Sequence, residues 1–175
     1  MPPDALVKKY ASLLQNDDLD GPVLDLACGR GQNGLYVAEL GLPVILADRS
    51  ADALKMAQDS AREKGVQPEF WEVDLESGVD PLPVDHFHAI LVFRYLHRPL
   101  IPKIRQAVRE GGIVIYETFT DEQPKYGKPH NPDFLLRPGE LAAWFEDWEV
   151  IHSFEGLLEA PRRAAAQVVC RKPFV

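Results

Sequence analysis

The stretch Val23-Leu-Asp-Leu-Ala-Cys-Gly-Arg-Gly-Gln-Asn-Gly34 joins an apolar run to a glycine-rich turn. Its first residues, 23–27, are mostly apolar and predict a short buried strand. Gly29, Gly31 and Gly34 follow in the spacing G-x-G-x-x-G, and a helical pattern begins after them. Glycines let a backbone turn sharply and approach a ligand closely, while the start of a helix offers unpaired N–H groups. The stretch therefore predicts a strand-turn-helix unit of the kind that binds nucleotides.

The alternation of strands and helices continues on both sides of this unit. Further strands are expected at residues 43–47, 69–73, 87–93, 113–118, 148–154 and 164–171, and helices at 5–14, 35–40, 50–64, 100–109 and 139–145. Ser50 is the expected N-cap of one helix and Gly65 its end, while Gly111-Gly112 is expected to stop another. This alternation favours a mostly parallel sheet covered on both faces. We therefore expect one Rossmann-like, doubly wound α/β domain over residues 1–175.

Residues 119–138 interrupt the alternation. This stretch is polar and contains prolines at positions 124, 129, 132 and 138, which predicts a long loop. In compact domains a structureless connection of this length is uncommon, and it often serves as a lid or a binding loop. We expect it to lie over the acceptor site.

The composition is that of an ordinary globular protein, with 46% of the 175 residues hydrophobic and 26% charged. The formal net charge of −8 would repel a polyphosphate backbone, and no run of lysines and arginines compensates for it, so nucleic acid is not expected as a partner. No run approaches the ~18 apolar residues of a membrane span, and no signal peptide is visible. Cys28 and Cys170 are too few for a disulfide framework and lack metal-ligand spacing. A cytoplasmic protein without a metal is expected, and its oligomeric state is not indicated.

Two carboxylates bear on the kind of nucleotide that is bound. Asp48 ends the second expected strand, where it can accept hydrogen bonds from both ribose hydroxyls, which predicts an adenosine site. A dinucleotide and an adenosyl sulfonium would both satisfy this prediction. Asp25, if it points at the ligand, would repel a pyrophosphate but attract the ammonium of a methionine moiety. This charge favours S-adenosylmethionine, with NAD as the lesser alternative.

These motifs resemble those of class I S-adenosylmethionine-dependent methyltransferases. The resemblance covers residues 23–31, Ala47-Asp48, Val73-Asp74-Leu75 and the stretch from Ile90 to His97. It implies a sheet of about seven strands whose last strand is antiparallel. The cofactor-binding residues that it implies are Asp25, Ala27, Gly29, Gly31 and Phe93 at the methionine portion, Asp48 at the ribose, Asp74 and Leu75 at the adenine, and Arg49, which follows Asp48.

A narrower resemblance is to small methyltransferases of the tellurite-resistance type. It rests on Tyr116-Glu-Thr-Phe119, Asn131-Pro-Asp-Phe-Leu-Leu136 and Pro138-Gly-Glu-Leu141. Those enzymes methylate soft nucleophiles such as tellurite, selenite or small thiols, so the resemblance implies a small-molecule acceptor of this kind. Their C-terminal basic motif is echoed by Arg162-Arg163, with no neighbouring histidine.

The predicted catalytic residues are Arg94, Tyr95 and His97, which follow the fourth expected strand. Ligands gather at the carboxyl ends of strands in open parallel sheets. Arg94 could attract an anionic acceptor, and His97 could take a proton from an acceptor that needs to lose one. Further candidates for the acceptor site are Arg98, Glu117, Tyr126 and His130.

The chemistry of the reaction leaves the acceptor open. In-line methyl transfer from a sulfonium mainly requires alignment of donor and nucleophile, and a thiol needs only modest activation, so no strong general base is required. An O- or N-methyltransferase of a small metabolite is one alternative. A non-catalytic, cofactor-binding regulatory subunit is another, because a fold alone does not separate these functions.

Overall fold

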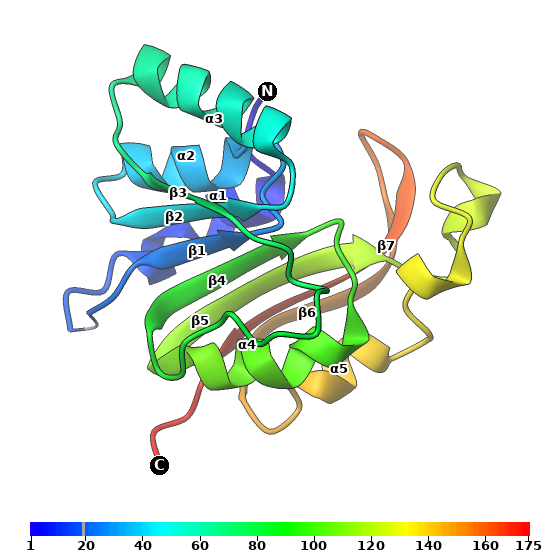
Figure 1. The fold of residues 1–175 in the computed structure, drawn as a ribbon. Helices are drawn as coiled ribbons and strands as arrows, with labels where there is room; N and C mark the ends of the chain where they lie inside the picture. Colours follow the sequence, from blue (N-terminus) through cyan, green and yellow to red (C-terminus); the bar gives the residue numbers. More distant parts are fainter. Residues whose placement is uncertain (19) are drawn as a thin grey trace.

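The computed structural model describes residues 1–18 and 20–175, and a seven-stranded sheet forms its centre (Figure 1). The strands are β1 (Val23–Leu26), β2 (Val44–Asp48), β3 (Glu69–Glu72), β4 (Phe87–Phe93), β5 (Val108–Phe119), β6 (Glu149–Leu158) and β7 (Arg163–Arg171). They lie in the order β3-β2-β1-β4-β5-β7-β6. Neighbours from β3 to β5 are parallel, while β7 is antiparallel to both β5 and β6. The expected mostly parallel sheet with an antiparallel last strand is confirmed.

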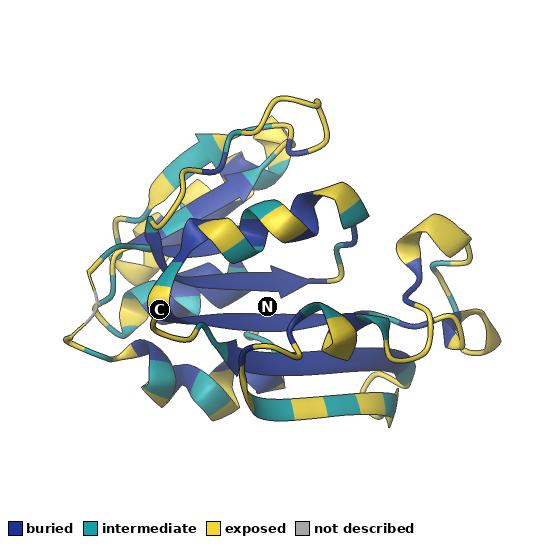
Figure 2. Ribbon diagram, turned by 90° about the horizontal axis from the view of Figure 1, so that it is seen from below, coloured by how far each residue is buried: buried dark blue, intermediate teal, exposed yellow. Residues whose placement is uncertain are grey.

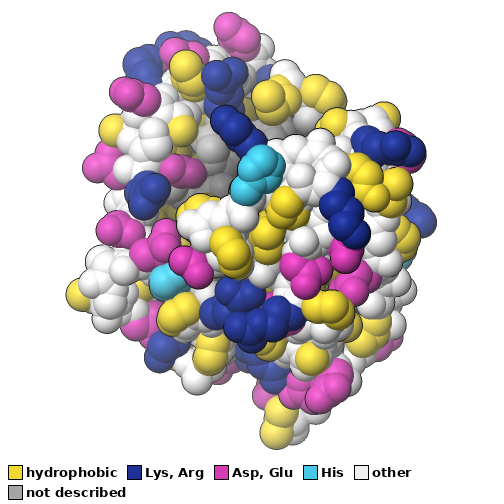
Figure 3. Space-filling view, turned by 90° about the vertical axis from the view of Figure 1, so that its right-hand side faces the viewer, with side chains coloured by type: hydrophobic (Ala, Val, Ile, Leu, Met, Phe, Trp, Pro, Cys, Tyr) yellow, Lys and Arg dark blue, Asp and Glu magenta, His cyan; other side chains and the backbone are white. Residues whose placement is uncertain are grey.

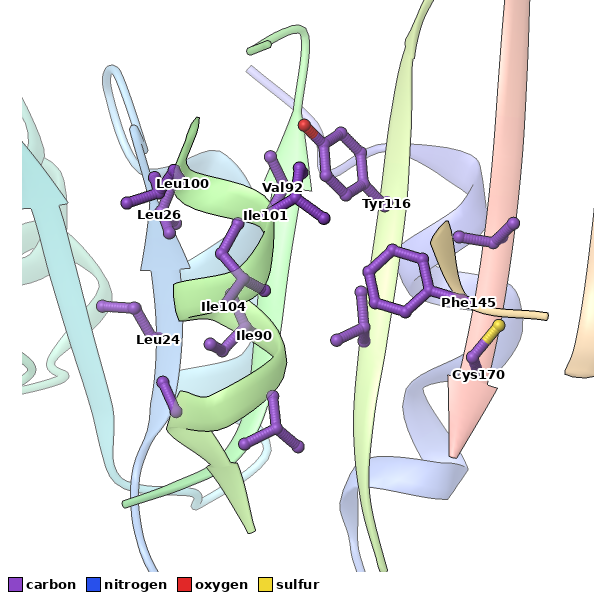
Figure 4. Close-up of a cluster of buried hydrophobic side chains, with 14 of the residues drawn as sticks. Leu24, Leu26, Ile90, Val92, Leu100, Ile101, Ile104, Tyr116, Phe145 and Cys170 are labelled. Atoms are coloured by element: carbon purple, nitrogen blue, oxygen red, sulfur yellow. The ribbon is translucent and has the colours of Figure 1, made fainter. Parts of the chain in front are cut away.

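Helices cover both faces of the sheet. They are α1 (Ala5–Tyr10), α2 (Gln32–Glu39), α3 (Ala51–Lys64), α4 (Ile101–Ala107) and α5 (Glu140–Trp144). Successive side chains of a strand point to opposite faces, so each strand serves two cores. Val23 packs with apolar residues of α1, α2 and α3, whereas Leu24 and Leu26 pack with α4 and α5. Figure 4 shows this second core, in which Ile101 and Ile104 of α4 lie against the sheet.

The central strands are the most deeply buried part of the molecule. All seven residues from Phe87 to Phe93 in β4 and all four residues of β1 are buried. The edge strands β3 and β6 are only partly covered, as Figure 2 shows by their yellow and teal segments. Burial on both faces explains why β1 and β4 are near-continuous apolar runs. No helix in the described part of the chain is long and apolar enough to span a bilayer.

Both predicted limits of the helix after β2 are confirmed. The side chain of Ser50 accepts a hydrogen bond from the N–H of Ala53 at 3.1 Å, which satisfies one of the unpaired donors in the first turn of α3. Gly65 ends the helix with a left-handed φ of 69°. The predicted helix over 5–14 is shorter than expected: α1 ends at Tyr10, and a 3₁₀ turn continues from Ala11 to Leu14.

The prediction that Gly111-Gly112 stops a helix is wrong. The helix α4 ends at Ala107, and both glycines lie inside β5, which begins at Val108. A Cβ atom on Gly112 would come within 2.7 Å of the carbonyl oxygen of His88 in β4. Gly112 therefore permits a close approach of β4 and β5 where their register shifts, whereas a Cβ atom on Gly111 would meet the ring of Phe174. Glycine is common both after a helix and where two backbones approach closely, so its presence in the sequence does not distinguish these two structures.

The segment 119–138 is more ordered than the predicted structureless loop. It contains two 3₁₀ turns, η3 (Gln123–Lys125) and η4 (Pro132–Phe134). Its two ends are held together, because the N–H of Leu136 donates to the carbonyl oxygen of Phe119 and the N–H of Asp121 donates to that of Leu136, both at 2.9 Å. In Figure 1 the segment, drawn in yellow-green, projects beyond the end of β5.

Candidate active site

Five neighbouring strands each bring one residue to the wall of a single cavity. Asp74 follows β3, Asp48 ends β2, Ala27 follows β1, Arg94 follows β4 and Thr118 lies near the end of β5. The cavity has a volume of about 460 Å³, and its wall is completed by Arg49, Val73, Leu75, Glu76, Tyr95, Leu96, Phe119, Pro129 and Phe134. Both the volume and the position at the carboxyl edge of the sheet are those of a small-molecule site.

The glycines of the turn after β1 have different roles. Gly29 has a left-handed φ of 56°, and a Cβ atom there would meet nothing within 4 Å. Neither Gly29 nor Gly31 belongs to the described cavity wall. A Cβ atom on Gly34 would lie only 2.2 Å from Leu46 Cδ2, so this glycine allows α2 to pack against β2. Gly31 is intermediate, with φ 79° and Leu46 Cδ1 at 3.1 Å from its Cβ position. The motif thus has open space at the Cβ position of Gly29, while the Cβ positions of Gly31 and Gly34 lie close to Leu46.

Asp25 lies beneath this turn and is absent from the described cavity wall. Its side chain is 3% exposed, and Oδ2 accepts the backbone N–H of Gly34 at 2.8 Å. Burial raises the pKa of Asp25 to about 7, because desolvation disfavours its charged form. We expected this carboxylate to point at the ligand. In the structure it instead lies outside the cavity wall and holds the start of α2.

Asp48 occupies the position expected of a ribose acceptor. Its Oδ2 accepts the N–H of Gly29 at 2.8 Å and its Oδ1 accepts the N–H of Ser50 at 2.9 Å, so the carboxylate is held rigidly at the cavity wall. Arg49 lines the cavity beside it. A carboxylate has about four acceptor positions, which leaves capacity for two hydroxyl groups.

Asp74 and Leu75 form the wall on the β3 side of Asp48. The Oδ1 of Asp74 accepts the N–H of Glu76 at 3.0 Å, which fixes the carboxylate in a tight turn. Leu75 is buried and belongs to the core cluster beneath the cavity. An apolar side chain next to a carboxylate suits a flat heterocycle with an amino group, because the ring packs on Leu75 while the amino group donates to Asp74.

Tyr95 and Glu76 lie together on the cavity wall. The buried hydroxyl of Tyr95 has no hydrogen-bond partner of good geometry among the described residues. Burial and then the nearby charge of Glu76 raise the pKa of Tyr95 well above its usual value, which argues against Tyr95 as a proton acceptor near neutral pH. His97 does not line the cavity; its Nδ1 lies 3.3 Å from Glu76 Oε1. Among the predicted catalytic residues, Arg94 and Tyr95 thus reach the cavity wall and His97 does not.

Phe93 is also absent from the described wall. It is 7% exposed, and the guanidinium carbon of Arg94 lies 5.9 Å from the centre of its ring. The four other residues predicted for the acceptor site also do not line the cavity. Glu117 bonds to Arg163 and Gln167, Arg98 bonds to Glu140, Tyr126 is 42% exposed, and His130 lies at the surface.

Sequence reasoning missed several residues of the wall. Thr118, Phe119 and Phe134 lie in two of the three stretches that carried the narrower resemblance, so a signal for them existed. Glu76 directly follows the Asp74-Leu75 pair, which was a weaker signal. Within residues 1–18 and 20–175, no group of three or more His, Cys, Asp or Glu side chains is arranged to hold a metal ion.

Figure 3 views the molecule from the side on which the parallel strands end. Acidic, basic and apolar side chains are mixed over this face rather than gathered into a continuous basic stripe.

Comparison with known proteins places these features in a family. Residues 23–112, just over half of the chain, match the family model described as "Methyltransferase domain". The chain is 26% identical over 170 residues to the probable S-adenosyl-L-methionine-dependent methyltransferase TehB of Haemophilus influenzae, covering 89% of this chain and 58% of that protein. It is 26% identical over 156 residues to the tRNA 5-carboxymethoxyuridine methyltransferase of Escherichia coli K12, covering 74% of this chain and 60% of that protein. The chain thus spans about half to three fifths of the length of the curated relatives it matches.

Solved structures show the same fold. The crystal structure of TehB from Haemophilus influenzae superposes with a TM-score of 0.72 at 21% identity, over 97% of this chain and 66% of that one. A structure from Methanosarcina mazei, described as a SAM-dependent methyltransferase, superposes with a TM-score of 0.73 at 15% identity over 100% of both chains. The strand order, the turn between Asp25 and Gly34 and the family match agree: this chain belongs to the methyltransferase domain family of class I S-adenosylmethionine-dependent enzymes.

Proposed function

We propose that the chain transfers the methyl group of S-adenosylmethionine to a small, soft nucleophile of the thiol, tellurite or selenite type. The observation that carries this proposal is the composition of the cavity beyond Arg94. There, Phe119, Pro129 and Phe134 bring apolar surface from the 119–138 segment, and Thr118 adds one hydroxyl. A small apolar chamber favours a compact acceptor whose nucleophilic atom is polarizable.

The residues of the cavity suit the adenosine part of the cofactor. Asp48 would accept the ribose hydroxyls, Asp74 would accept from the adenine amino group, and Leu75 would pack against the ring. The open Cβ position of Gly29 leaves room for the ligand along the turn. When bound, the cofactor supplies a methyl group activated by the positive charge on sulfur.

The chain's own residues would contribute mainly orientation and exclusion of water. Alignment of two reacting groups can supply about 7–11 kcal/mol of barrier reduction without proton transfer. Tyr95, with its raised pKa, keeps its proton at neutral pH and can donate a hydrogen bond but not serve as a base. A thiol, with an ordinary pKa of about 8.5, reaches its nucleophilic form with little assistance. The narrower resemblance to small methyltransferases of the tellurite-resistance type supports the same class of acceptor.

An oxygen acceptor is the second candidate. The specific observation that favours it is the similarity to a tRNA 5-carboxymethoxyuridine methyltransferase, whose name indicates a carboxylate-bearing nucleoside. The net charge of −8 and the mixed surface of Figure 3 argue against a whole tRNA and leave a small carboxylate as the better form of this alternative.

Turnover with an acceptor panel tests the proposal. The purified chain is incubated with S-adenosylmethionine and, separately, with small thiols, tellurite, selenite, small carboxylates and tRNA, and the demethylated cofactor is measured. We expect product with one or more soft acceptors above the rate without acceptor. Turnover with carboxylates or tRNA alone would contradict the proposed acceptor class. Tight cofactor binding without turnover on any acceptor would favour the non-catalytic regulatory subunit.

A further inference from the structure

Asp4, near the start of the chain, forms a two-point ion pair with Arg94 on the cavity wall. Its Oδ1 accepts from Arg94 Nη1 at 2.8 Å, and its Oδ2 accepts from Arg94 Nη2 at 3.0 Å. Planar, two-bond pairing of this kind fixes both the position and the orientation of a guanidinium group. The pair joins residues that are ninety positions apart in the sequence.

Asp4 is itself held from a second side by the helix that follows the glycine turn. The side-chain amide of Asn33 donates to Asp4 Oδ2 at 2.8 Å, and the backbone N–H of Asp4 donates to Asn33 Oδ1 at 2.8 Å. Burial works against ionisation of Asp4, but the hydrogen bonds from Arg94 and Asn33 outweigh it and keep the pKa of Asp4 below its usual value. The same pairing raises the pKa of Arg94. Both partners are therefore charged at neutral pH.

The Arg94 side of the pair belongs to the cofactor cavity. Arg94 is the first residue after β4 and has a left-handed φ of 54°, a conformation that non-glycine residues rarely adopt. Ala27, the first residue after the adjacent strand β1, also has a φ of 54°. Strained backbone at two neighbouring strand ends on one cavity wall indicates that the surrounding structure enforces the position of Arg94.

The order of the strand ends shows which part of the cofactor comes near Arg94. Asp74 and Asp48 follow β3 and β2 and offer acceptors for the adenosine portion. The wall then continues past Ala27 to Arg94 and Thr118. A ligand whose adenosine lies at the two carboxylates extends its methionine end in that direction. An uncompensated guanidinium there would repel a sulfonium cation, while a neutral thioether would be affected little.

We propose that Asp4 is a positioning residue that neutralises and immobilises Arg94 and thereby lets the cavity bind the positively charged S-adenosylmethionine as readily as its neutral-sulfur product, S-adenosylhomocysteine. This inference rests on the proposed function only in taking S-adenosylmethionine as the cofactor; it is independent of the acceptor. It assigns a role in cofactor discrimination to a residue far from every cofactor motif in the sequence.

The test measures a ratio that loss of packing alone would not change. Dissociation constants for S-adenosylmethionine and S-adenosylhomocysteine are determined by calorimetry at low salt for the wild type and for Asp4→Asn. We expect the ratio of the two constants to rise about fivefold in favour of S-adenosylhomocysteine, the size expected of one unit charge near a partly hydrated site. The rise should shrink at high salt, because exposed charges are then screened.

Two further variants serve as controls. Asp147→Asn breaks a similar two-bond pair with Arg105, with distances of 3.0 and 2.6 Å, away from the cavity, and should leave the ratio unchanged. Asp4→Asn combined with Arg94→Gln removes both charges and should restore the wild-type ratio.

Three outcomes would overturn the proposal. The first is an unchanged ratio in Asp4→Asn, including an equal weakening of both ligands, which would mean that Asp4 only fastens the N-terminal segment. The second is a raised ratio that persists in the double variant. The third is a folded wild type that binds neither ligand, which would overturn the cofactor assignment as well and is recognised before any variant is made.

Discussion

Asp25 Oδ2 accepts the backbone N–H of Gly34 at 2.8 Å, so the buried carboxylate of β1 holds the first turn of α2 from beneath the glycine turn. This contact connects the centre of the sheet to the glycine turn that precedes α2. The contact requires an acidic side chain to be buried, and this burial raises the pKa of Asp25 to about 7.

Stability should therefore fall as pH rises through the range in which Asp25 ionises. The pKa of Asp25 is higher in the folded protein than in the unfolded chain, so the folded state binds the proton more tightly. Proton binding by Asp25 therefore adds to the free energy of unfolding below pH ~4, and this stabilisation is lost as the pH rises toward 7. Asp25→Asn keeps an oxygen for the Gly34 N–H and cannot ionise. We expect it to match the wild type near pH 4 and to be up to about 4 kcal/mol more stable at pH 8. Urea denaturation at both pH values measures this, and a difference independent of pH would contradict it.

Asp48→Ala should weaken the binding of S-adenosylmethionine by about 10- to 100-fold, because both ribose hydroxyls lose their charged acceptor. Calorimetric titration measures the change. Asp59→Ala, which removes an exposed carboxylate paired with Lys55, is the matched control and should bind like the wild type. Equal affinities of Asp48→Ala and the control would remove Asp48 from the site.

Gly34→Ala should mainly lower the stability of the protein, whereas Gly29→Ala should mainly weaken cofactor binding. The Cβ atom on Gly34 would collide with Leu46 and with Asp25 Oδ2 at 2.9 Å, so Gly34→Ala should lower the free energy of unfolding by about 2–4 kcal/mol. A Cβ atom on Gly29 meets no protein atom and enters the open space beside the turn, so we expect Gly29→Ala mainly to weaken cofactor binding.

The matched control for Gly29 is Gly41, which also has a left-handed φ, of 90°, and open space at its Cβ position. Both alanine variants should carry the same backbone penalty of about 1–2 kcal/mol in denaturation experiments. Only Gly29→Ala should weaken binding of S-adenosylmethionine. If Gly41→Ala weakened binding equally, the effect would be a general consequence of backbone strain.

Phe134→Ala should raise the KM of the acceptor by about tenfold while leaving the cofactor's dissociation constant near its wild-type value. The reason is that Phe134 contributes apolar surface to the cavity from the 119–138 segment. Tyr126→Ala removes another exposed aromatic side chain of the same segment that does not line this cavity, and it should leave the KM unchanged. Steady-state kinetics with the best soft acceptor of the panel decides. An equal rise of the KM in both variants would mean that the conformation of the 119–138 segment matters, and that Phe134 makes no specific contact with the acceptor.

Much of the fold could be predicted because it follows from local patterns. The limits of β4 at Phe87 and Phe93 agree with the prediction, since a buried parallel strand is a continuous apolar run bounded by turn residues. The cap at Ser50 and the stop at Gly65 were predictable for the same reason: the backbone geometry of a helix end constrains the residue that occupies it. Asp48 was predicted from its place at the end of a strand, and Asp74 from the family resemblance; both lie on the cavity wall.

The sequence by itself determined which elements form, their order and the kind of cofactor, because these depend on side-chain periodicity and on motifs within a few residues of one another. Only the tertiary structure decided that Asp25 lies beneath the turn, that His97 faces Glu76 outside the cavity wall, and that Asp4 meets Arg94. Such contacts join residues that are distant in the chain, and they depend on how strands and helices pack. Local sequence patterns carry no information about that packing, which sets the charge and shape of the site.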